Sequence, residues 1–433
     1  MSKWQEAYLG EVINFYSGGT PSKARSDYWG GGIPWVSAKD MKSFFLEDSE
    51  DHITEVGLAN GTKLAPAGSV LLLTRGMTLL NNVPICVLQR PMAFNQDIKA
   101  VRPKAGICQE FVPYLLLGNK ENLLNLVDLA GHGTGRLNSN DLKTLSILLP
   151  PLPEQKAIAR MLSALDDKIE LNRRMNETLE AMARAIFKDW FVDFGPTRAK
   201  QEGRAAYLPE YLWSLFPGAI DEQTGLPQGW WFRKFGDVVR SVSETYPLKT
   251  KSEVVFLNTG DILNGSFLHA NKSNVSTLPG QAKKSIQKGD ILYSEIRPQN
   301  KRFAYVYFDA PEYVVSTKLM VLRQTSDIKS LFIYFLLTHQ SNIDFLQMMA
   351  ESRSGTFPQI TFDVVSSMDF INTSDNRLIQ LFTDDFLGVV HQKTLENNLQ
   401  SRTLADLRDR LLPKLMSGEI RVKEAEKMAE EVL

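Results

Sequence analysis

Apolar and polar positions follow two different patterns along this chain. Short, continuous apolar runs bounded by Gly, Pro or polar residues predict buried strands in two regions, 4–150 and 229–372. A long stretch of helical spacing follows each region. The expected strands are Val70–Leu73, Ile85–Leu88, 254–257, 291–293 and 304–307, and the expected shorter helices are 111–117 and 328–349. The pattern therefore predicts two mixed modules, each followed by a long helix.

The first long pattern predicts a helix that begins at Pro153 and runs to about Phe191, with Gly195 and Pro196 ending it. Its apolar positions recur in alternating steps of four and three residues, which is the spacing of a coiled-coil seam rather than of a broad globular stripe. These positions are Ile158, Leu162, Leu165, Ile169, Leu179, Ala183, Ile186 and Trp190.

Asn172 and Asn176 continue the rhythm of this seam. A buried asparagine at such a position fixes the register and the partner at a cost in stability. Alternatively, the seam opens there, and Leu171 and Met175 carry the packing on a neighbouring face. Both interpretations stay open at the level of sequence.

A second helical pattern covers residues 376–418 and has a less regular seam. Pro413 lies inside it and predicts a kink or an end nearby, and residues 423–433 form a charged tail. Because each apolar seam needs a partner, we expect the two long helices to pair side by side in antiparallel orientation. This pairing would place the modules at opposite ends, related by a pseudo-two-fold axis. A helix of about 38 residues would be roughly 57 Å long and could act as a ruler between them.

The chain contains two unequal copies of one pattern, and a repeat of this length indicates the architecture directly. Trp4 and Trp230 each stand five residues before a block of Leu or Phe, Gly, an acid and Val, at 9–12 and 235–238. Further matches pair 68–71 with 289–292, 94–102 with 315–323, and 133–134 with 355–356. The predicted fold is a mixed α/β one, with two similar globular modules separated by two long helices that pair as an antiparallel coiled coil.

Five segments follow from these patterns. They are a first module over 1–152, a central helix over 153–196, a connector over 197–228, a second module over 229–374, and a C-terminal helix with its tail over 375–433. The connector is rich in Gly, Pro and polar residues but also carries aromatic residues, which favours an ordered connection over a free tether.

Composition narrows the class of protein only slightly. The formal net charge of -1 over 433 residues argues against a chain that grips nucleic acid alone, unless positive charge is local and partners supply the rest. Cys86 and Cys108 fit two buried thiols in a reducing compartment. The N-terminus lacks the apolar core of a signal peptide, and no apolar run reaches the ~20 residues of a membrane span. We expect a cytoplasmic protein.

Sequence signatures of catalysis are missing. There is no P-loop and no Asn/Asp-Pro-Pro-Tyr/Phe block of the amino-methyltransferase type. The five His residues are scattered, so no metal site is expected. The stretch 131–135 resembles a phosphate loop only superficially, since strand–helix context is lacking. Asp290 with Glu295 and Arg297 faintly suggests a metal nuclease, but a satisfied strand end is favoured. No catalytic residue is predicted.

Several blocks resemble specificity subunits of type I restriction–modification systems, and the match covers essentially the whole chain. Gly18-Gly19-Thr20-Pro21-Ser22, then 28–30 and 33–36, is similar to the opening of their target-recognition domains. Residues 149–156 resemble the entry to their central helix, and 187–194 resemble its end. Residues 226–230 resemble the start of a second recognition domain, and 411–420 resemble the end of the C-terminal helix. The second copy lacks the GGTPS and IPWV blocks, so its recognition domain looks like a different subtype.

The resemblance implies a non-catalytic, sequence-specific DNA-binding subunit. Each recognition domain would bind one half of a split double-stranded DNA target, and the helices would hold the spacing and dock two methyltransferase subunits. Restriction subunits would join such a complex where they are present. S-adenosylmethionine, and ATP with Mg²⁺ where a restriction subunit is present, would be bound by those partners, and this chain would hold no cofactor.

DNA reading needs Arg, Lys, Asn and Gln at base edges and hydroxyls or N–H groups at phosphates. The candidates in the first module are Thr20, Ser22, Lys23, Arg25, Arg75, Asn95, Gln96 and Arg136. Those in the second module are Lys249, Lys251, Arg297, Gln299, Asn300, Lys301, Arg302, Arg353 and Thr356. About half of these are expected to be ordinary solvated surface residues. The run 297–302 is the best single patch, since it combines basic and amide side chains.

Large apolar residues at the helix ends, Trp190, Phe191, Leu411 and Leu415, are candidates for methyltransferase docking. The alternative is that they pack against the connector within the chain. For the whole protein, two other functions stay open: a coiled-coil scaffold without DNA contact, and a nuclease.

Overall fold

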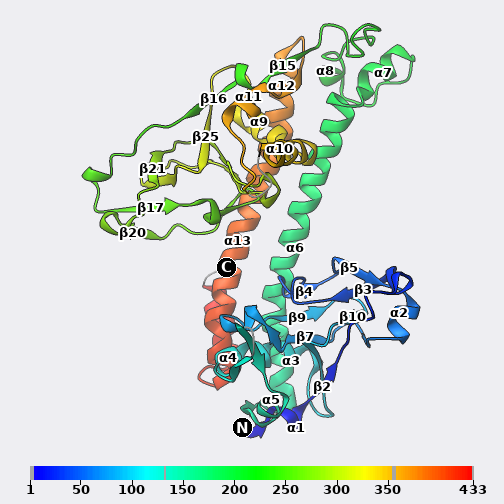
Figure 1. Cartoon of the computed structure of the whole chain (residues 1–433), viewed down its shortest axis with the longest axis vertical. Coiled ribbons are helices and arrows are strands. Elements are labelled where there is room, and N and C mark those ends of the chain that lie inside the picture. The colour runs from blue at the N-terminus through cyan, green and yellow to red at the C-terminus, as the bar shows by residue number, and fades with distance from the viewer. Residues whose placement is uncertain (1–3, 131–132, 354–356, 432–433) are drawn as a thin grey trace. The chain divides into compact units, whose positions relative to one another are not determined.

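The computed structural model describes residues 4–130, 133–353 and 357–431 (Figure 1). The chain divides into two compact units, the first comprising Met1–Met175 and Glu396–Leu433 and the second comprising Asn176–Leu395. Both long helices pass from one unit into the other, so each unit combines a strand-rich module with a part of each helix.

In the part of the first unit that the structure describes, the strands form four sheets. The largest has the order β2-β11-β7-β9-β4, and the next has the order β5-β3-β10-β6. A pair β1-β14 and a three-stranded sheet β12-β13-β8 complete the module. The strands are β1 Gln5–Tyr8, β2 Ile13–Ser17, β3 Trp29–Val36, β4 Phe45–Leu46, β5 Asp51–Ile53, β6 Leu64–Ala65, β7 Val70–Leu73, β8 Arg75–Gly76, β9 Ile85–Leu88, β10 Met92–Phe94, β11 Ile98–Pro103, β12 Val127–Ala130, β13 Thr134–Leu137 and β14 Ser146–Leu149.

The second unit repeats this plan. Its sheets have the orders β16-β25-β22-β23, β20-β17-β24-β21, β15-β26 and β18-β19. The strands are β15 Trp231–Lys234, β16 Val239–Val242, β17 Glu253–Leu257, β18 Ile262–Leu263, β19 Ser266–Phe267, β20 Lys272–Asn274, β21 Ala282–Ser285, β22 Ile291–Ser294, β23 Phe303–Tyr305, β24 Tyr313–Ser316, β25 Leu319–Gln324 and β26 Asp369–Asn372.

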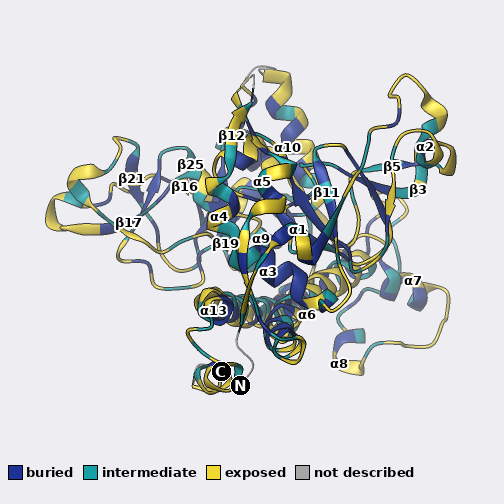
Figure 2. Cartoon of the chain, turned by 90° about the horizontal axis from the view of Figure 1, so that it is seen from below, coloured by how far each residue is buried: buried dark blue, intermediate teal, exposed yellow. Residues whose placement is uncertain are grey.

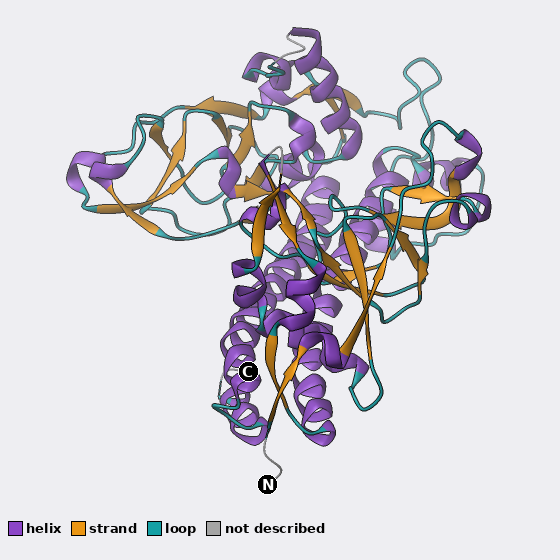
Figure 3. Ribbon diagram, turned by 60° about the horizontal axis from the view of Figure 1, so that its bottom comes forward, coloured by secondary structure: helices purple, strands orange, loops and turns teal. Residues whose placement is uncertain are grey.

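Each unit has short helices beside its sheets, and the chain also has two long helical regions (Figure 3). The first unit has α1 Leu9–Val12, α2 Glu55–Ala59, α3 Val112–Gly118, α4 Lys120–Asn125, α5 Ser139–Thr144 and α14 Val422–Glu430. The second has α7 Gly195–Gln201, α8 Glu210–Trp213, α9 Ser330–Leu337, α10 Gln340–Arg353, α11 Phe362–Ser367 and α12 Asn376–Leu381. The long helices are α6 Leu152–Phe191 and α13 Val389–Ser417.

Each unit has its own apolar core. β7 in the first unit and β22 in the second are buried along their whole lengths, as expected for continuous apolar runs. Peripheral elements are more exposed: three of the six residues of β11 are buried, whereas α2 is mostly exposed (Figure 2). The predicted strands are present, although β23 ends at Tyr305, two residues earlier than expected.

The predicted internal repeat is confirmed at the level of strand order. The four strands β2-β11-β7-β9 correspond to β16-β25-β22-β23, and β5-β3-β10-β6 corresponds to β20-β17-β24-β21. Gly68 and Gly289 occupy equivalent turns with φ of 76° and 91°, a region that favours glycine. Their N–H groups donate to the carbonyls of Leu88 and Val306, each at 2.7 Å. The same backbone turn therefore enters the central buried strand of both copies.

The two long helices pair in antiparallel orientation, as predicted. Within the first unit, Asn172 of α6 contacts Asn397, and Asp166 contacts Arg408 further along α13. Lower numbers on α6 thus meet higher numbers on α13. Within the second unit, the end of α6 packs against the start of the C-terminal helical region, where the rings of Trp190 and Phe382 lie 5.8 Å apart.

Asn172 decides between the two interpretations of the seam. Its side chain is 1% exposed, whereas Leu171 is exposed. The amide nitrogen donates to the Asn397 carbonyl at 3.3 Å and to the side chains of Gln400 and Ser401 at 2.9 and 3.2 Å. The structure therefore supports a buried, hydrogen-bonded asparagine that fixes the register at this position.

The helix boundaries differ from the predictions in detail. α6 ends at Phe191 as expected, but Gly195 and Pro196 begin α7 rather than ending α6, because Phe194 adopts φ of 55° and breaks the helix first. The C-terminal region is not uniform, since a wider helical turn occupies Phe382–Gly388 between α12 and α13. Pro413 lies inside α13, which ends four residues later at Ser417. The expected end near Pro413 is thus observed. No helix in the part of the chain that the structure describes has the length and apolar character required to cross a lipid bilayer.

Candidate nucleic-acid interface

The glycine-rich loop of the first module packs against the end of β10. A Cβ atom at Gly18 would overlap the carbonyl oxygen of Phe94, and the Gly19 N–H donates to that carbonyl at 2.9 Å. This close backbone approach brings Thr20 to Gln96, whose side-chain oxygen accepts a hydrogen bond from the Thr20 hydroxyl at 2.6 Å. Both residues are exposed. The structure thus joins two predicted DNA-binding residues that lie 76 positions apart.

Asn95, in contrast, is only 7% exposed. Its side-chain oxygen accepts from the Asp97 N–H at 3.0 Å, and its own N–H donates to the Val36 carbonyl at 2.9 Å. These bonds shape the turn between β10 and β11. The geometry gives Asn95 a positioning role beneath Gln96 rather than a direct contact with a ligand.

Arg25, a third candidate of this loop, is exposed but already paired. Its guanidinium lies 2.7 Å from the Asp27 carboxylate and 4.9 Å from the ring centroid of Tyr28. The hydrogen bond from Arg25 lowers the pKa of Asp27. The pair therefore brings little net charge to the loop, whereas Ser22 and Lys23 stand exposed beside it.

Arg75 and Arg136 come together on the sheet β12-β13-β8. β13 pairs antiparallel with β8, and Arg136 stands directly opposite Arg75. Both side chains are exposed. Two predicted candidates that are 61 positions apart therefore form one cationic pair at the surface of the first module.

In the second module, the predicted patch 297–302 forms a tight turn. Arg297 and Lys301 adopt left-handed backbone conformations with φ of 45° and 53°, on either side of a short helical turn at Pro298–Asn300. Arg297, Gln299 and Asn300 are exposed, and Lys301 is partly buried. Non-glycine residues with positive φ are uncommon and mark turns held by their surroundings. The turn presents one guanidinium and two amides to solvent.

Arg302 differs from its neighbours in this patch. Its guanidinium donates to the carbonyl oxygens of Gly260 and Ile262, each at 3.0 Å. These bonds tie the turn to the preceding loop, which gives Arg302 a structural role.

The remaining candidates of the second module are spread over other loops. Lys249 and Lys251 are exposed near the start of β17. Arg353 ends α10 and donates to the Thr361 hydroxyl at 3.0 Å. Thr356 lies outside the described residues. The structure therefore does not gather all second-module candidates into one site.

The two modules use equivalent backbone positions with different side chains. In the second module, an isolated bridge pairs Ile296 with Gln359, where the first module pairs Arg75 with Arg136. Arg297 is one residue beyond Ile296, which is the equivalent of Arg75 when 68–71 is matched with 289–292. The two candidate surfaces have the same backbone pairing but different side chains.

The docking prediction for the helix ends is wrong. Trp190, Phe191, Leu411 and Leu415 are all at least 98% buried. Trp190 packs on Phe216 of the connector at 5.4 Å between ring centroids, and Leu411 and Leu415 belong to the core of the first unit. The alternative of packing within the chain holds, because aromatic and leucine side chains at a helix end are the material from which a module's own core is built.

The faint nuclease signal is likewise explained by structure. Asp290 is fully buried and forms a two-pronged ion pair with Arg323 at 2.8 and 2.9 Å. Within residues 4–130, 133–353 and 357–431, no three His, Cys, Asp or Glu side chains come together in a way that could hold a metal ion. Cys86 and Cys108 are buried and unpaired, and burial raises the pKa of the Cys86 thiol to about 12.

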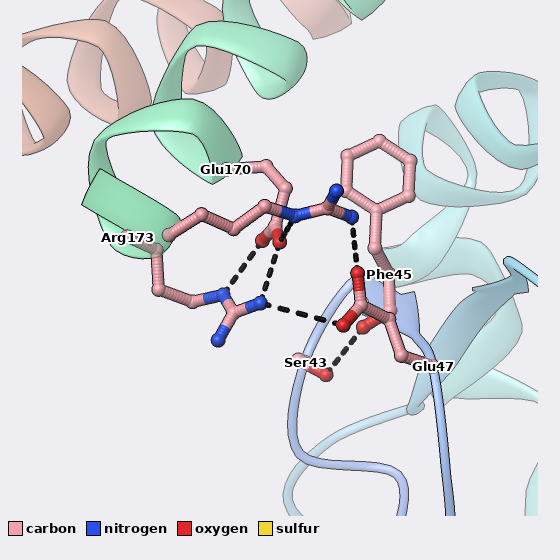
Figure 4. A network of polar contacts seen from close by, with 6 residues as sticks. Ser43, Phe45, Glu47, Glu170 and Arg173 are labelled. Carbon is pink, nitrogen blue, oxygen red and sulfur yellow. Dashed lines mark hydrogen bonds and ion pairs between the residues drawn. The ribbon is translucent and has the colours of Figure 1, made fainter. Parts of the chain in front are cut away.

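One polar network was not foreseen from sequence (Figure 4). Glu47, which follows β4, forms ion pairs with Arg174 and, at 3.8 Å, with Arg173, and both arginines also bind Glu170 on α6. The hydrogen bond from Arg173 is the main reason that the pKa of Glu170 is lowered. The Arg173 and Arg174 pair on α6 therefore holds the β4 loop of the first module against the helix. The basic pair at 173–174 was the available signal, but its acidic partner lies 127 positions away from Arg174.

Two exposed apolar residues were also missed. Leu129 is 80% exposed on β12, and Met77 is 73% exposed just after β8. Strand alternation alone would have assigned Leu129 to a buried face.

Comparison with known proteins gives a consistent result. The family model for the type I restriction modification DNA specificity domain matches residues 1–181 and 227–371. The chain is 26% identical to the type I restriction enzyme MjaIX specificity subunit of Methanocaldococcus jannaschii, over 97% of this chain and 94% of that protein.

One further relative matches a shorter stretch, and one solved structure matches nearly the whole chain. The chain is 49% identical to the type I restriction enzyme HindI specificity subunit of Haemophilus influenzae over 156 residues, which span 36% of this chain and about a third (34%) of that protein. A solved type I restriction–modification S subunit from M. genitalium has the same fold, with a TM-score of 0.52, 14% identity, and coverage of 95% of this chain and 96% of the other.

Proposed function

The chain belongs to the family of proteins built from type I restriction modification DNA specificity domains, and we propose that it selects the DNA sequence on which a type I restriction–modification complex acts. Each module contacts one half of a split target in double-stranded DNA. The two halves differ in sequence because the modules differ in the side chains that face the DNA.

One observation carries this proposal. The two modules have the same strand order, yet the equivalent strand ends carry Arg75 and Arg136 in one copy and Ile296 and Gln359 in the other. A scaffold that needed only its helices would have no reason to keep two strand-rich modules with exposed arginines and amides. Base edges are read by such side chains, while the backbone that supports them can stay constant.

The proposal assigns the chemistry to partner chains. Two methyltransferase subunits would dock on the helical part of the chain, and restriction subunits would join where they exist. S-adenosylmethionine would be held by the methyltransferase subunits, and ATP with Mg²⁺ by the restriction subunits. The long helices would set the distance between the two half-sites.

Co-expression with the methyltransferase subunits tests the function. We expect methylation of one motif with two constant halves and a spacer of fixed length, mapped in the host genome by single-molecule sequencing. The same methyltransferase subunits without this chain serve as the control and should leave the motif unmethylated. Sequence-independent DNA binding by the full complex would contradict the proposal. If DNA binding by the complex did not depend on salt concentration, a scaffold without DNA contact would be favoured. DNA cleavage by the purified chain with Mg²⁺ would favour a nuclease.

A further inference from the structure

The sheet β12-β13-β8 of the first unit carries charges in an unfavourable arrangement. Arg136 on the middle strand stands directly opposite Arg75 on β8, and Asp128 on β12 stands on its other side. Directly opposite side chains have Cβ atoms about 4.5–5.5 Å apart, and like charges at this distance destabilise a sheet. Among the described residues, neither guanidinium forms an ion pair or a hydrogen bond. Arg136 therefore forms no ion pair with Asp128, although the two residues stand opposite each other.

The backbone that holds these two arginines is tightly supported. Gly135 stands opposite Gly76, and a Cβ atom at Gly135 would lie 2.8 Å from Cβ of Leu79, which is fully buried. The Leu137 N–H donates to the Thr74 carbonyl at 2.9 Å. Because strand side chains alternate between faces, this packing on one face fixes the direction of Arg75 and Arg136 on the other. The pair is therefore held in place from behind, while its own face is open.

The second copy shows that the fold does not need these charges. Its equivalent backbone contacts are present, since the Ile360 N–H donates to the Glu295 carbonyl at 2.8 Å and Ile296 pairs with Gln359. The Gln359 amide donates to the Glu295 carboxylate at 2.7 Å, and Lys318 pairs with the same carboxylate at 4.0 Å, so two arginines do not face each other at this place in the second module. A cationic pair that costs stability and occurs in only one copy calls for an anionic ligand.

We propose that Arg75 and Arg136 act together as a clamp for a single phosphate of the DNA backbone at the first half-site. The inference rests on the proposed function and assigns the pair a position-setting role, not a base-reading one. Two guanidinium groups side by side present several N–H donors to the oxygens of one phosphate, and charge-assisted bonds of this kind are strong. Met77, two residues after Arg75, is 73% exposed at the same edge of the sheet.

The test uses the complex of this chain with its methyltransferase subunits. Equilibrium binding is measured over a range of salt concentrations for the wild type, R75A, R136A and R75A/R136A, on the target duplex and on a duplex with a scrambled first half-site. Each phosphate contact contributes about 0.9 to the slope of log affinity against log salt. We expect each single variant to weaken binding but leave this slope nearly unchanged, because the remaining arginine still contacts the phosphate, and the double variant to lower the slope by about 0.9. Affinity should fall by the same factor on both duplexes.

Arg90 supplies a matched control, since it is an exposed arginine in a turn of the same module. R90A should leave the slope unchanged. Thermal unfolding separates binding from folding, because removing two like charges should not lower the melting temperature of the double variant. The proposal is overturned by an unchanged slope in the double variant, by a drop of about two in that variant, or by relaxed specificity at one base pair with the slope intact. A wild-type complex that binds all sequences equally would instead refute the proposed function itself.

Discussion

Arg408 of α13 forms an ion pair with Asp166 of α6 at 2.5 Å inside the first unit. Asp166 also contacts the first module. Asp166 is 3% exposed, and its second carboxylate oxygen accepts a hydrogen bond from Tyr114 of α3 at 2.9 Å. Burial raises the pKa of Asp166, while Arg408 and Tyr114 oppose that rise. One carboxylate therefore ties both long helices and the first module together.

The substitution Arg408→Leu is expected to destabilise the first unit by about 3 kcal/mol, because it leaves a buried carboxylate without its cation. The double variant Asp166→Leu with Arg408→Leu should lose less, since no uncompensated charge remains. Urea unfolding measures both, and Arg410→Leu, at an exposed position of the same helix, is the control. A double variant as unstable as the single one would contradict the reasoning.

His391 should make the stability of the second unit depend on pH. Its ring lies 5.4 and 5.9 Å from those of Tyr305 and Tyr307, and burial lowers its pKa to about 4. The folded state thus favours the neutral imidazole, so this contribution is complete above about pH 6.5 and is lost as pH falls towards 4. We expect a loss of up to about 3 kcal/mol over this range, because one pKa unit corresponds to about 1.4 kcal/mol.

Unfolding free energies of wild type and His391→Phe, measured across pH 4–7, isolate this effect. Phenylalanine keeps a ring between the two tyrosines but cannot be protonated. The difference between the two curves should grow as pH falls, and parallel curves would exclude a role for His391.

Gly135→Ala is expected to destabilise the first module by about 1–3 kcal/mol, the cost of overpacking a filled site. Its Cβ would meet Leu79 and Val127 at 2.8 and 2.9 Å. Since this contact supports Arg136, the variant should also weaken binding at the first half-site. Gly32→Ala, where no atom lies within 4 Å of the added Cβ, should change neither the melting temperature nor binding.

A substitution in one module should affect recognition only at the half-site that this module contacts. Gln96→Ala removes an exposed amide from the first module, and Arg297→Ala removes an exposed guanidinium from the second. If these groups read base edges, each variant should lose about 1–3 kcal/mol of discrimination at one base pair of its own half-site. Methylation mapping and binding to duplexes altered in one half measure this. Equal losses at both halves in either variant would show that the modules are coupled.

Local patterns in the sequence determined the elements and the repeat. Steps of four and three residues predicted α6 to within a residue at each end, and Pro413 predicted the nearby end of α13. The repeated blocks predicted two copies of one strand order, because the same turn residues and the same buried runs recur at matching places. These signals are short-range, and short-range geometry is what helical and strand periodicity encode.

The tertiary structure alone decided which side chains meet and which are exposed. Nothing in the local pattern separates Asn95, which is buried, from Gln96, which faces solvent beside Thr20. Trp190 and Leu411 looked like docking residues, yet each completes the core of its own unit. Arg75 and Arg136 became neighbours only through strand register over 61 positions, since pairing between distant strands depends on the whole fold and leaves no trace in local spacing.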